Sequence, residues 1–193
     1  MRGRVLTIPN VLSVIRLMLV PVFLYLLLVR HAYGPAVAIL IFGGVSDWAD
    51  GKIARLVANQ SSQLGELLDP LVDRVYMVVV PVGLALAGVV GWPVVAILVG
   101  RDAVLAATLP FLRSRGITAL PVSYVGKAAT FALMSGFPLI LLGQFDSGWG
   151  RVIGLIGWGF LIWGIGMYLW SAVLYLLGVR LVLRGLPRVH PRP

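Results

Sequence analysis

The sequence predicts an all-α membrane protein with six transmembrane helices, and its composition and patterning are the observations that predict this. Of its 193 residues, 60% are hydrophobic and 12% are charged, and the mean hydropathy is +0.98, values outside the soluble globular range. Apolar runs recur along the whole chain, separated by Gly, Pro and charged residues. Because a spanning helix needs about 20 predominantly apolar residues, this length has room for about six. We expect one membrane domain over 1–193, with a short N-terminal segment, 1–10, and a basic tail, 183–193.

The six predicted spans follow the apolar runs in order. Arg16 interrupts the first run and no small-residue cleavage site follows it, so we interpret this run as a retained span rather than a signal peptide. The last run is longer than one span requires, and its Gly150 and Gly154 form a GxxxG motif, which is a weak packing signal. The expected spans are Val11–Val29, Pro35–Val57, Asp69–Val90, Pro93–Leu112, Lys127–Gly143 and Trp149–Val182.

The basic residues gather on one side of the predicted membrane domain. The chain has 16 Lys and Arg against 7 Asp and Glu, a formal net charge of +9. If six spans alternate in direction, the basic residues that flank them fall on one side of the membrane. The exceptions are Arg30 and Arg151, which lie near the opposite side. The positive-inside rule then predicts cytosolic N- and C-termini in a plasma-membrane protein. Such a charge favours anionic lipid headgroups rather than nucleic acid as a partner, and the absence of cysteine excludes disulfides and thiol chemistry.

Acidic residues are concentrated in one segment. Five of the seven lie from Asp47 to Asp73. Asp47 and Asp50 are three residues apart on one predicted helix, and Asp69 and Asp73 are four apart on the next, so each pair shares a helical face. A single carboxylate in a span can join helices or sit in a solvated turn, but intramembrane acids usually mark function. Four facing carboxylates would repel one another unless a hard cation such as Mg²⁺ or Mn²⁺ neutralised them. The set predicts a metal site at the cytosolic end of the second and third spans.

Small residues and an arginine mark the same segment. Gly51 and Gly65 have no side chain and Ala54 has a small one, so a phosphate or nucleotide can approach the backbone there. Either glycine alone is equally a packing or turn residue. Arg55 presents a planar fork of donors suited to a pyrophosphate, or serves as a positive-inside anchor.

Read together, these residues form a known pattern. Residues 47–55 read DWADGKIAR, and after nine further residues positions 65–73 read GELLDPLVD. This resembles the signature of the CDP-alcohol phosphotransferase family, D-x-x-D-G-x-x-A-R, eight or nine residues, G-x-x-x-D-x-x-x-D, with all eight fixed positions matched. The stretch from Thr7 to Arg16 also resembles the start of family members. The resemblance covers nearly the whole chain and implies six spans around a cytosol-facing polar cavity, in a homodimer.

The resemblance also implies a role for each matched residue. It implies that Asp47, Asp50 and Asp69 are the principal metal ligands, and that Asp73 is both a ligand and the general base. It implies that the CDP moiety of CDP-diacylglycerol is bordered by Gly51, Ala54, Arg55 and Gly65. The chemistry agrees, because a carboxylate beside a cation can take a proton from an incoming hydroxyl while the cation stabilises charge on the pyrophosphate and the departing CMP.

The acceptor alcohol has to be argued from the second half of the chain. Arg101-Asp102, Arg113 and the segment that opens with Gly126-Lys127 resemble the cardiolipin synthase branch of the family, so Arg101, Arg113 and Lys127 are candidate acceptor-binding residues. Arg101 is equally explained as a structural partner of a carboxylate in the acidic cluster. Arg113 and Lys127 are also explained by topology alone.

Three functions follow from these observations. The leading expectation is transfer of a phosphatidyl group from CDP-diacylglycerol to phosphatidylglycerol, which gives cardiolipin and CMP. The alternative is phosphatidylglycerophosphate synthesis with glycerol 3-phosphate, which needs a basic pocket open to water, whereas a lipid acceptor needs a lateral opening between spans. An ion-coupled transporter is a remote alternative. Acids along an ion path would be spread through the membrane depth, whereas in this sequence they are concentrated in one segment.

Overall fold

The computed structural model describes six helices, and all regular secondary structure in the described residues is α-helical. This confirms the predicted all-α class. The backbone is described over 8–56, 63–115 and 123–185, and the side chains over 11–46, 71–115 and 123–184. The helices are α1 Ile8–Leu28, α2 Tyr33–Leu56, α3 Gln63–Leu86, α4 Trp92–Arg113, α5 Tyr124–Leu142 and α6 Gly148–Gly185.

Each predicted span corresponds to one helix, and the boundaries differ most in α3. This helix begins at Gln63, six residues before the predicted start at Asp69, so Gly65 and Asp69 both lie inside it. It ends at Leu86 rather than at Val90. Gly88 has a φ of +73°, a conformation that glycine adopts without a steric penalty, and this turn ends the helix.

Four helices are long and apolar enough to cross a membrane, counted over the described residues. These segments are Val11–Leu28, Trp92–Arg113, Tyr124–Leu142 and Gly148–Arg184. The apolar part of α2 found over the described residues, Tyr33–Ser46, is shorter than these four segments. Together with the apolar composition, the four segments indicate an integral membrane protein.

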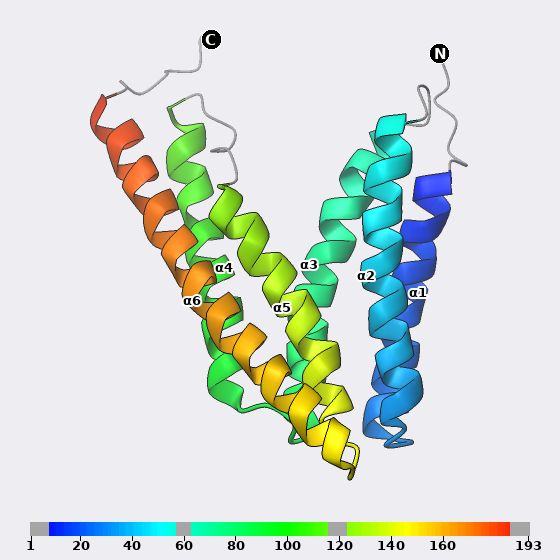
Figure 1. Ribbon diagram of the computed structural model, residues 1–193. Helices are drawn as coiled ribbons and strands as arrows, with labels where there is room; N and C mark the ends of the chain where they lie inside the picture. The colour runs from blue at the N-terminus through cyan, green and yellow to red at the C-terminus, as the bar shows by residue number, and fades with distance from the viewer. Residues whose placement is uncertain (1–7, 57–62, 116–122, 186–193) are drawn as a thin grey trace.

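The helices form two halves that converge at one end and separate at the other (Figure 1). In one half α1 packs against α2 and α3, and in the other α6 packs against α4 and α5. The halves are joined where α2 contacts α5 and where α3 contacts α4. The first residues of α1 and the last residues of α6 lie at the end where the halves separate (Figure 1). We call this end the open end.

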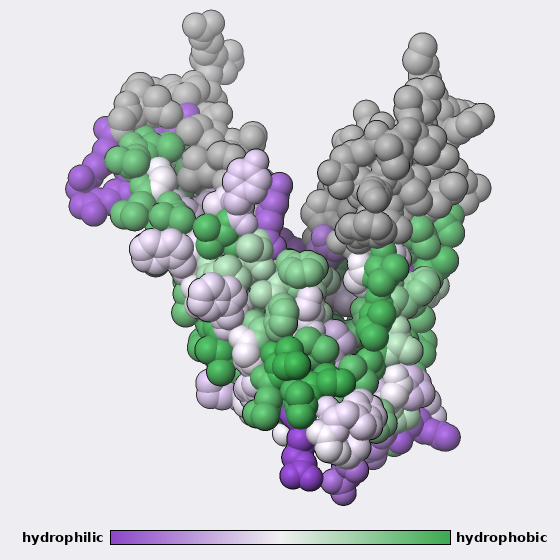
Figure 2. All heavy atoms as spheres, viewed as in Figure 1, coloured by the Kyte–Doolittle hydropathy of each residue, from purple (hydrophilic) through white to green (hydrophobic). Residues whose placement is uncertain are grey.

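Tightly buried apolar side chains from three helices lie toward the converging end. Leu27, Leu84 and Ile140 are in the last turns of α1, α3 and α5 and are at most 1% exposed. These apolar contacts hold the two halves together where the chain turns between helices. At the other end the two halves stand apart (Figure 1), and Figure 2 shows the notch between them.

Close packing of α5 on α6 depends on glycine. A Cβ atom added to Gly143 would lie 2.6 Å from the Cα atom of Gly154, and one added to Gly157 would lie 2.6 Å from the backbone nitrogen of Ile140. Small residues at such contacts let membrane helices approach closely. Gly154, one member of the GxxxG motif, is therefore a packing residue.

Candidate active site

The candidate site lies where α2 and α3 approach each other below the open end. A Cβ atom added to Gly43 on α2 would lie 3.2 Å from the Cε1 atom of Tyr76 on α3. Gly43 therefore leaves room for the Tyr76 side chain of α3 against α2. Helix α2 runs toward the open end from this contact, and α3 runs away from the open end toward it (Figure 1).

The four predicted carboxylate positions lie on the open-end side of this contact. Asp47 and Asp50 follow Gly43 by four and seven residues, and Asp73 and Asp69 precede Tyr76 by three and seven. At a rise of 1.5 Å per residue, Asp47 and Asp73 lie about 6 and 4.5 Å beyond the contact. Asp50 and Asp69 both lie about 10.5 Å beyond it. Helical spacing thus places the two pairs at matching levels of neighbouring helices.

The side chains of three of these aspartates, Asp47, Asp50 and Asp69, lie outside the described residues, as does that of Arg55. Gly51, Ala54 and Arg55 occupy the last two turns of α2, and Gly65 occupies the first turn of α3.

Asp73 is the predicted site residue whose side chain is described. Its side chain is 45% exposed, and its Oδ1 atom lies 3.5 Å from the Nη1 atom of Arg16 on α1, which is buried. Arg16 also lies 3.5 Å from the hydroxyl of Ser13 through its Nη2 atom. A buried cation is stabilised by an opposite charge beside it. Asp73 is therefore held from below by α1 while part of its carboxylate stays accessible.

Tyr76 completes this support. Its hydroxyl donates a hydrogen bond of 2.9 Å to the backbone carbonyl oxygen of Arg16, and the side chain is buried. One residue thus touches α1 through its hydroxyl and α2 through its ring, one turn away from Asp73. Sequence reasoning noted Arg16 only as a charge in an apolar run and did not single out Tyr76. The rarity of a charge inside a span was the signal that pointed to Arg16.

The donor chemistry of the four aspartates fits a divalent cation. Hard cations take carboxylate oxygens, and the accessible part of the Asp73 carboxylate is compatible with a second partner beside Arg16. Among the residues whose side chains the structure describes, no group of three or more His, Cys, Asp and Glu side chains is found. That description contains only one of the four predicted ligands, Asp73.

Arg101 belongs to a separate polar cluster between α4 and α6. Its Nη1 atom lies 2.9 Å from Asp102 Oδ1, and its Nη2 atom donates a 2.8 Å hydrogen bond to the hydroxyl of Ser171. The guanidinium lies 4.0 Å from the ring centroid of Tyr168, and the Tyr168 hydroxyl donates a 2.7 Å hydrogen bond to Asp102. These contacts favour the structural interpretation of Arg101. Among the described side chains, its polar partners are the neighbouring Asp102 and Ser171.

The other two candidate acceptor residues are exposed at the open end. Arg113 is in the last turn of α4, and Lys127 is in the first turn of α5, whose N-terminus is capped by the hydroxyl of Ser123. The Lys127 ammonium lies 5.8 Å from the ring centroid of Tyr124. Both cations are free to meet an anionic group at this level of the molecule.

A cleft of about 620 Å³ separates α2 from α5. Its walls include Leu40, Gly44 and Val45 on α2 and Lys127, Phe131 and Pro138 on α5. The notch between the two halves is visible in Figure 2. A cleft of this size lies within the range of small-molecule sites, which are mostly apolar with a few polar groups.

Comparison with known proteins identifies the family. The chain is 60% identical over 191 residues to the Mycobacterium tuberculosis protein named "Putative cardiolipin synthase", covering 99% of this chain and 91% of that protein. It is 44% identical over 188 residues to cardiolipin synthase (CMP-forming) of Streptomyces coelicolor, covering 94% and 86%. It is 31% identical over 140 residues to CDP-diacylglycerol–glycerol-3-phosphate 3-phosphatidyltransferase of Salmonella typhimurium, covering 69% and 76%. Residues 6–170 match the family profile itself, and the chain belongs to the CDP-alcohol phosphatidyltransferase family.

Proposed function

We propose that this enzyme of phospholipid biosynthesis transfers a phosphatidyl group from CDP-diacylglycerol to phosphatidylglycerol, which gives cardiolipin and CMP. The observation that carries the reaction class is the placement of four aspartates at matching levels of α2 and α3, beyond the Gly43–Tyr76 contact. The similarity to proteins named cardiolipin synthase, over nearly the whole chain, supports the lipid acceptor.

The site would hold one or more divalent cations on Asp47, Asp50, Asp69 and Asp73. A cation bound there, Mg²⁺ or Mn²⁺, would neutralise charge on the pyrophosphate and on the departing CMP. We assign Arg55 to the pyrophosphate, because its planar fork can donate two parallel hydrogen bonds to phosphate oxygens. Gly51, Ala54 and Gly65 would leave room for the CDP moiety against the backbone.

The transfer step has simple atom balance. The primary hydroxyl of the acceptor attacks the phosphorus of the phosphatidyl group, a new P–O bond forms, and the P–O bond to CMP breaks. Asp73 accepts the hydroxyl proton as the general base. Arg16 acts through Asp73 as a positioning residue, because its buried guanidinium, 3.5 Å from the Asp73 carboxylate, limits where that carboxylate can turn. Lys127 and Arg113 are the residues we assign to the phosphate of the acceptor.

We place the open end on the cytosolic side of the plasma membrane. Helices α2 and α3 have 24 residues each, about 36 Å, which is enough to cross a hydrocarbon core of about 30 Å. With these two, all six helices span the membrane and form a single domain. Arg113, Lys127 and Arg184 lie at the open end, whereas Arg30 and Arg151 flank the turns of the converging end, as the positive-inside rule requires for cytosolic termini. We also propose a homodimer, on the family resemblance.

The test is identification of the lipid product. Purified protein is incubated with CDP-diacylglycerol and Mg²⁺, with phosphatidylglycerol in one reaction and glycerol 3-phosphate in a second. Cardiolipin and CMP in the first reaction alone support the proposal. Phosphatidylglycerophosphate in the second reaction alone supports the alternative acceptor, for which the Salmonella relative is the precedent. If CMP is released in neither reaction, both proposed acceptors are rejected.

A further inference from the structure

The cleft between α2 and α5 has the length of one membrane leaflet. Its lining on α5 runs from Gly126 to Pro138, which is about 18 Å at 1.5 Å per residue. Half of a hydrocarbon core of about 30 Å is about 15 Å. Since α5 is itself a candidate membrane span, the cleft reaches from the open end to about the middle of the bilayer.

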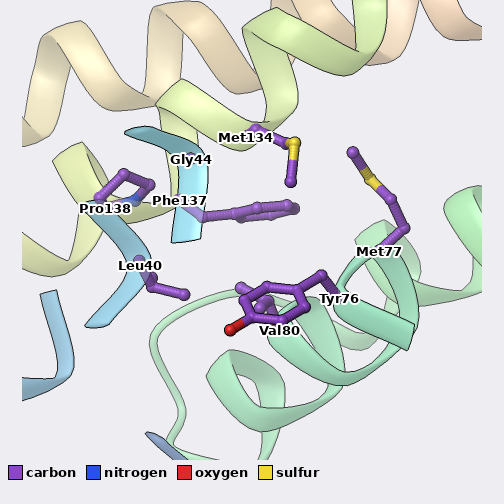
Figure 3. Close-up of a pocket in the computed structure, with 8 residues that line it drawn as sticks. All are labelled: Leu40, Gly44, Tyr76, Met77, Val80, Met134, Phe137 and Pro138. Atoms are coloured by element: carbon purple, nitrogen blue, oxygen red, sulfur yellow. The ribbon is translucent and has the colours of Figure 1, made fainter. Parts of the chain in front are cut away.

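The cleft also has the polarity of a phospholipid. Its charged lining residue is Lys127, at the open end, and below it Phe131, 71% exposed, and Val45, 58% exposed, present apolar surface. Pro138 at the lower end also lines a smaller pocket, together with Tyr76 and Phe137 (Figure 3). The apolar surface below Lys127 is complementary to an acyl chain.

The cleft adjoins Tyr76, which supports the candidate active site. Leu40, Gly44, Met134 and Pro138 line both the cleft and the smaller pocket, and the smaller pocket also includes Tyr76. Tyr76 is one helical turn from Asp73. The lining of the cleft on α2 ends at Val45, two residues or about 3 Å along the helix before Asp47, so an occupant of the cleft would lie just below the level of the four aspartates.

The α2 wall indicates which lipid occupies the cleft. Gly51 and Arg55 follow Gly44 by seven and eleven residues, spacings that keep a residue on the same face of a helix. The face that lines the cleft thus leads upward to the positions assigned to the CDP moiety. We propose that the α2–α5 cleft binds an acyl chain of CDP-diacylglycerol, with Gly44 and Phe131 as walls; this rests on the proposed function, which supplies the identity of the donor.

Filling the cleft tests this proposal, and a matched glycine serves as the control. A Cβ atom at Gly44 or at Gly100 on α4 would meet nothing within 4 Å, so either position can accept a leucine. Gly44→Leu narrows the cleft, whereas Gly100→Leu adds the same side chain outside it. CMP release is measured with a dioleoyl and with a water-soluble dihexanoyl form of CDP-diacylglycerol. We expect the ratio of the dioleoyl KM to the dihexanoyl KM to rise about tenfold in Gly44→Leu, equivalent to unburying about two methylene groups, and to stay at the wild-type value in Gly100→Leu.

An unchanged ratio in Gly44→Leu would overturn the proposal, as would an equal rise in both variants. Ser135→Leu, from the opposite wall, replaces Gly44→Leu if that variant does not fold. A dioleoyl donor with a diazirine at the chain end gives a readout without turnover. It should label α5 of the wild type, and unlabelled CDP-diacylglycerol, but not phosphatidylglycerol, should compete. Competition by phosphatidylglycerol alone would reject the donor assignment. Failure of wild-type protein to release CMP from either donor would reject the proposed function, while the labelling result would still decide whether a chain enters the cleft.

Discussion

A pair of glycines on α6 allows the packing of α5 on α6 to be measured. Gly157 is buried, and a Cβ atom there would lie 2.6 Å from the backbone nitrogen of Ile140. Gly159, two residues along the same helix, is exposed, and a Cβ atom there would meet nothing within 4 Å. The prediction compares Gly157→Ala with Gly159→Ala.

The expected magnitude follows from what the two substitutions share. Both replace glycine by alanine in the interior of one helix, so the gain in helix propensity, about 1 kcal/mol in water, is the same for both and cancels in the difference. What remains is the overpacking of one added methyl group, typically about 1–3 kcal/mol. The upper part of this range is favoured, because the neighbour of the Gly157 Cβ is backbone rather than a side chain that can rotate.

The assay is unfolding in mixed micelles by added denaturing detergent, followed by helical circular dichroism. Gly157→Ala should be less stable than Gly159→Ala by about 1–3 kcal/mol, and its activity should fall only as its folded fraction falls. Equal stability within about 0.5 kcal/mol, the usual scatter of surface substitutions, would refute the packing argument, and so would a larger loss in Gly159→Ala.

Four further predictions concern the polar residues. Chelation of divalent cations should abolish transfer because it removes the proposed metal. Asp50→Asn should also abolish transfer, because a ligand charge is lost while side-chain volume is kept. Full turnover by the chelated enzyme or by the variant would exclude the metal assignment. Arg55→Lys should raise the KM for CDP-diacylglycerol far more than the KM for the acceptor, since lysine lacks bidentate geometry, and a change in the acceptor KM alone would speak against a donor role. Asp73→Asn should bind the donor nearly as well as wild type while single-turnover CMP release falls about 10²- to 10⁴-fold; parallel losses would make Asp73 chiefly a ligand, and unchanged release would remove it from catalysis. Tyr168→Phe should lower stability by about 0.6–1.7 kcal/mol through the lost bond to Asp102 with an unchanged acceptor KM, and a raised KM at unchanged stability would place this cluster in the acceptor site.

Local sequence patterns predicted the helices but not their arrangement. Hydrophobic runs placed all six helices, because the length of an apolar run is a property of one segment. The start of α3 at Gln63 was missed, since the residues before Asp69 are polar enough to resemble a loop. Its end was missed because a positive φ at Gly88 depends on the turn that follows.

Contacts between distant segments could not be predicted from the sequence, for a different reason. Arg101 was expected either to bind an acceptor or to pair with the acidic cluster. Its described contacts are with Asp102 and with Ser171, which is 70 residues away in the chain. Nothing near Ser171 in the sequence indicates this contact, because it arises from the packing of α4 on α6. The family signature did place its acidic residues on two successive helices, because Asp47 and Asp50 lie in α2 and Asp69 and Asp73 lie in α3.

The length of α6 has a consequence for how the enzyme meets its substrates. The helix has 38 residues, about 57 Å, whereas a bilayer with its headgroup layers is about 40–45 Å thick. Its last turns therefore leave the hydrocarbon and carry Arg180 and Arg184, with the 72% exposed Leu181 between them, through the layer of lipid phosphates. Arginines held in that layer attract acidic phospholipids, so this helix end would enrich the surrounding leaflet in anionic lipids, the class to which both substrates of the proposed reaction belong. Raising the ionic strength should then slow the reaction in anionic vesicles through the local lipid supply, without any change at the aspartates.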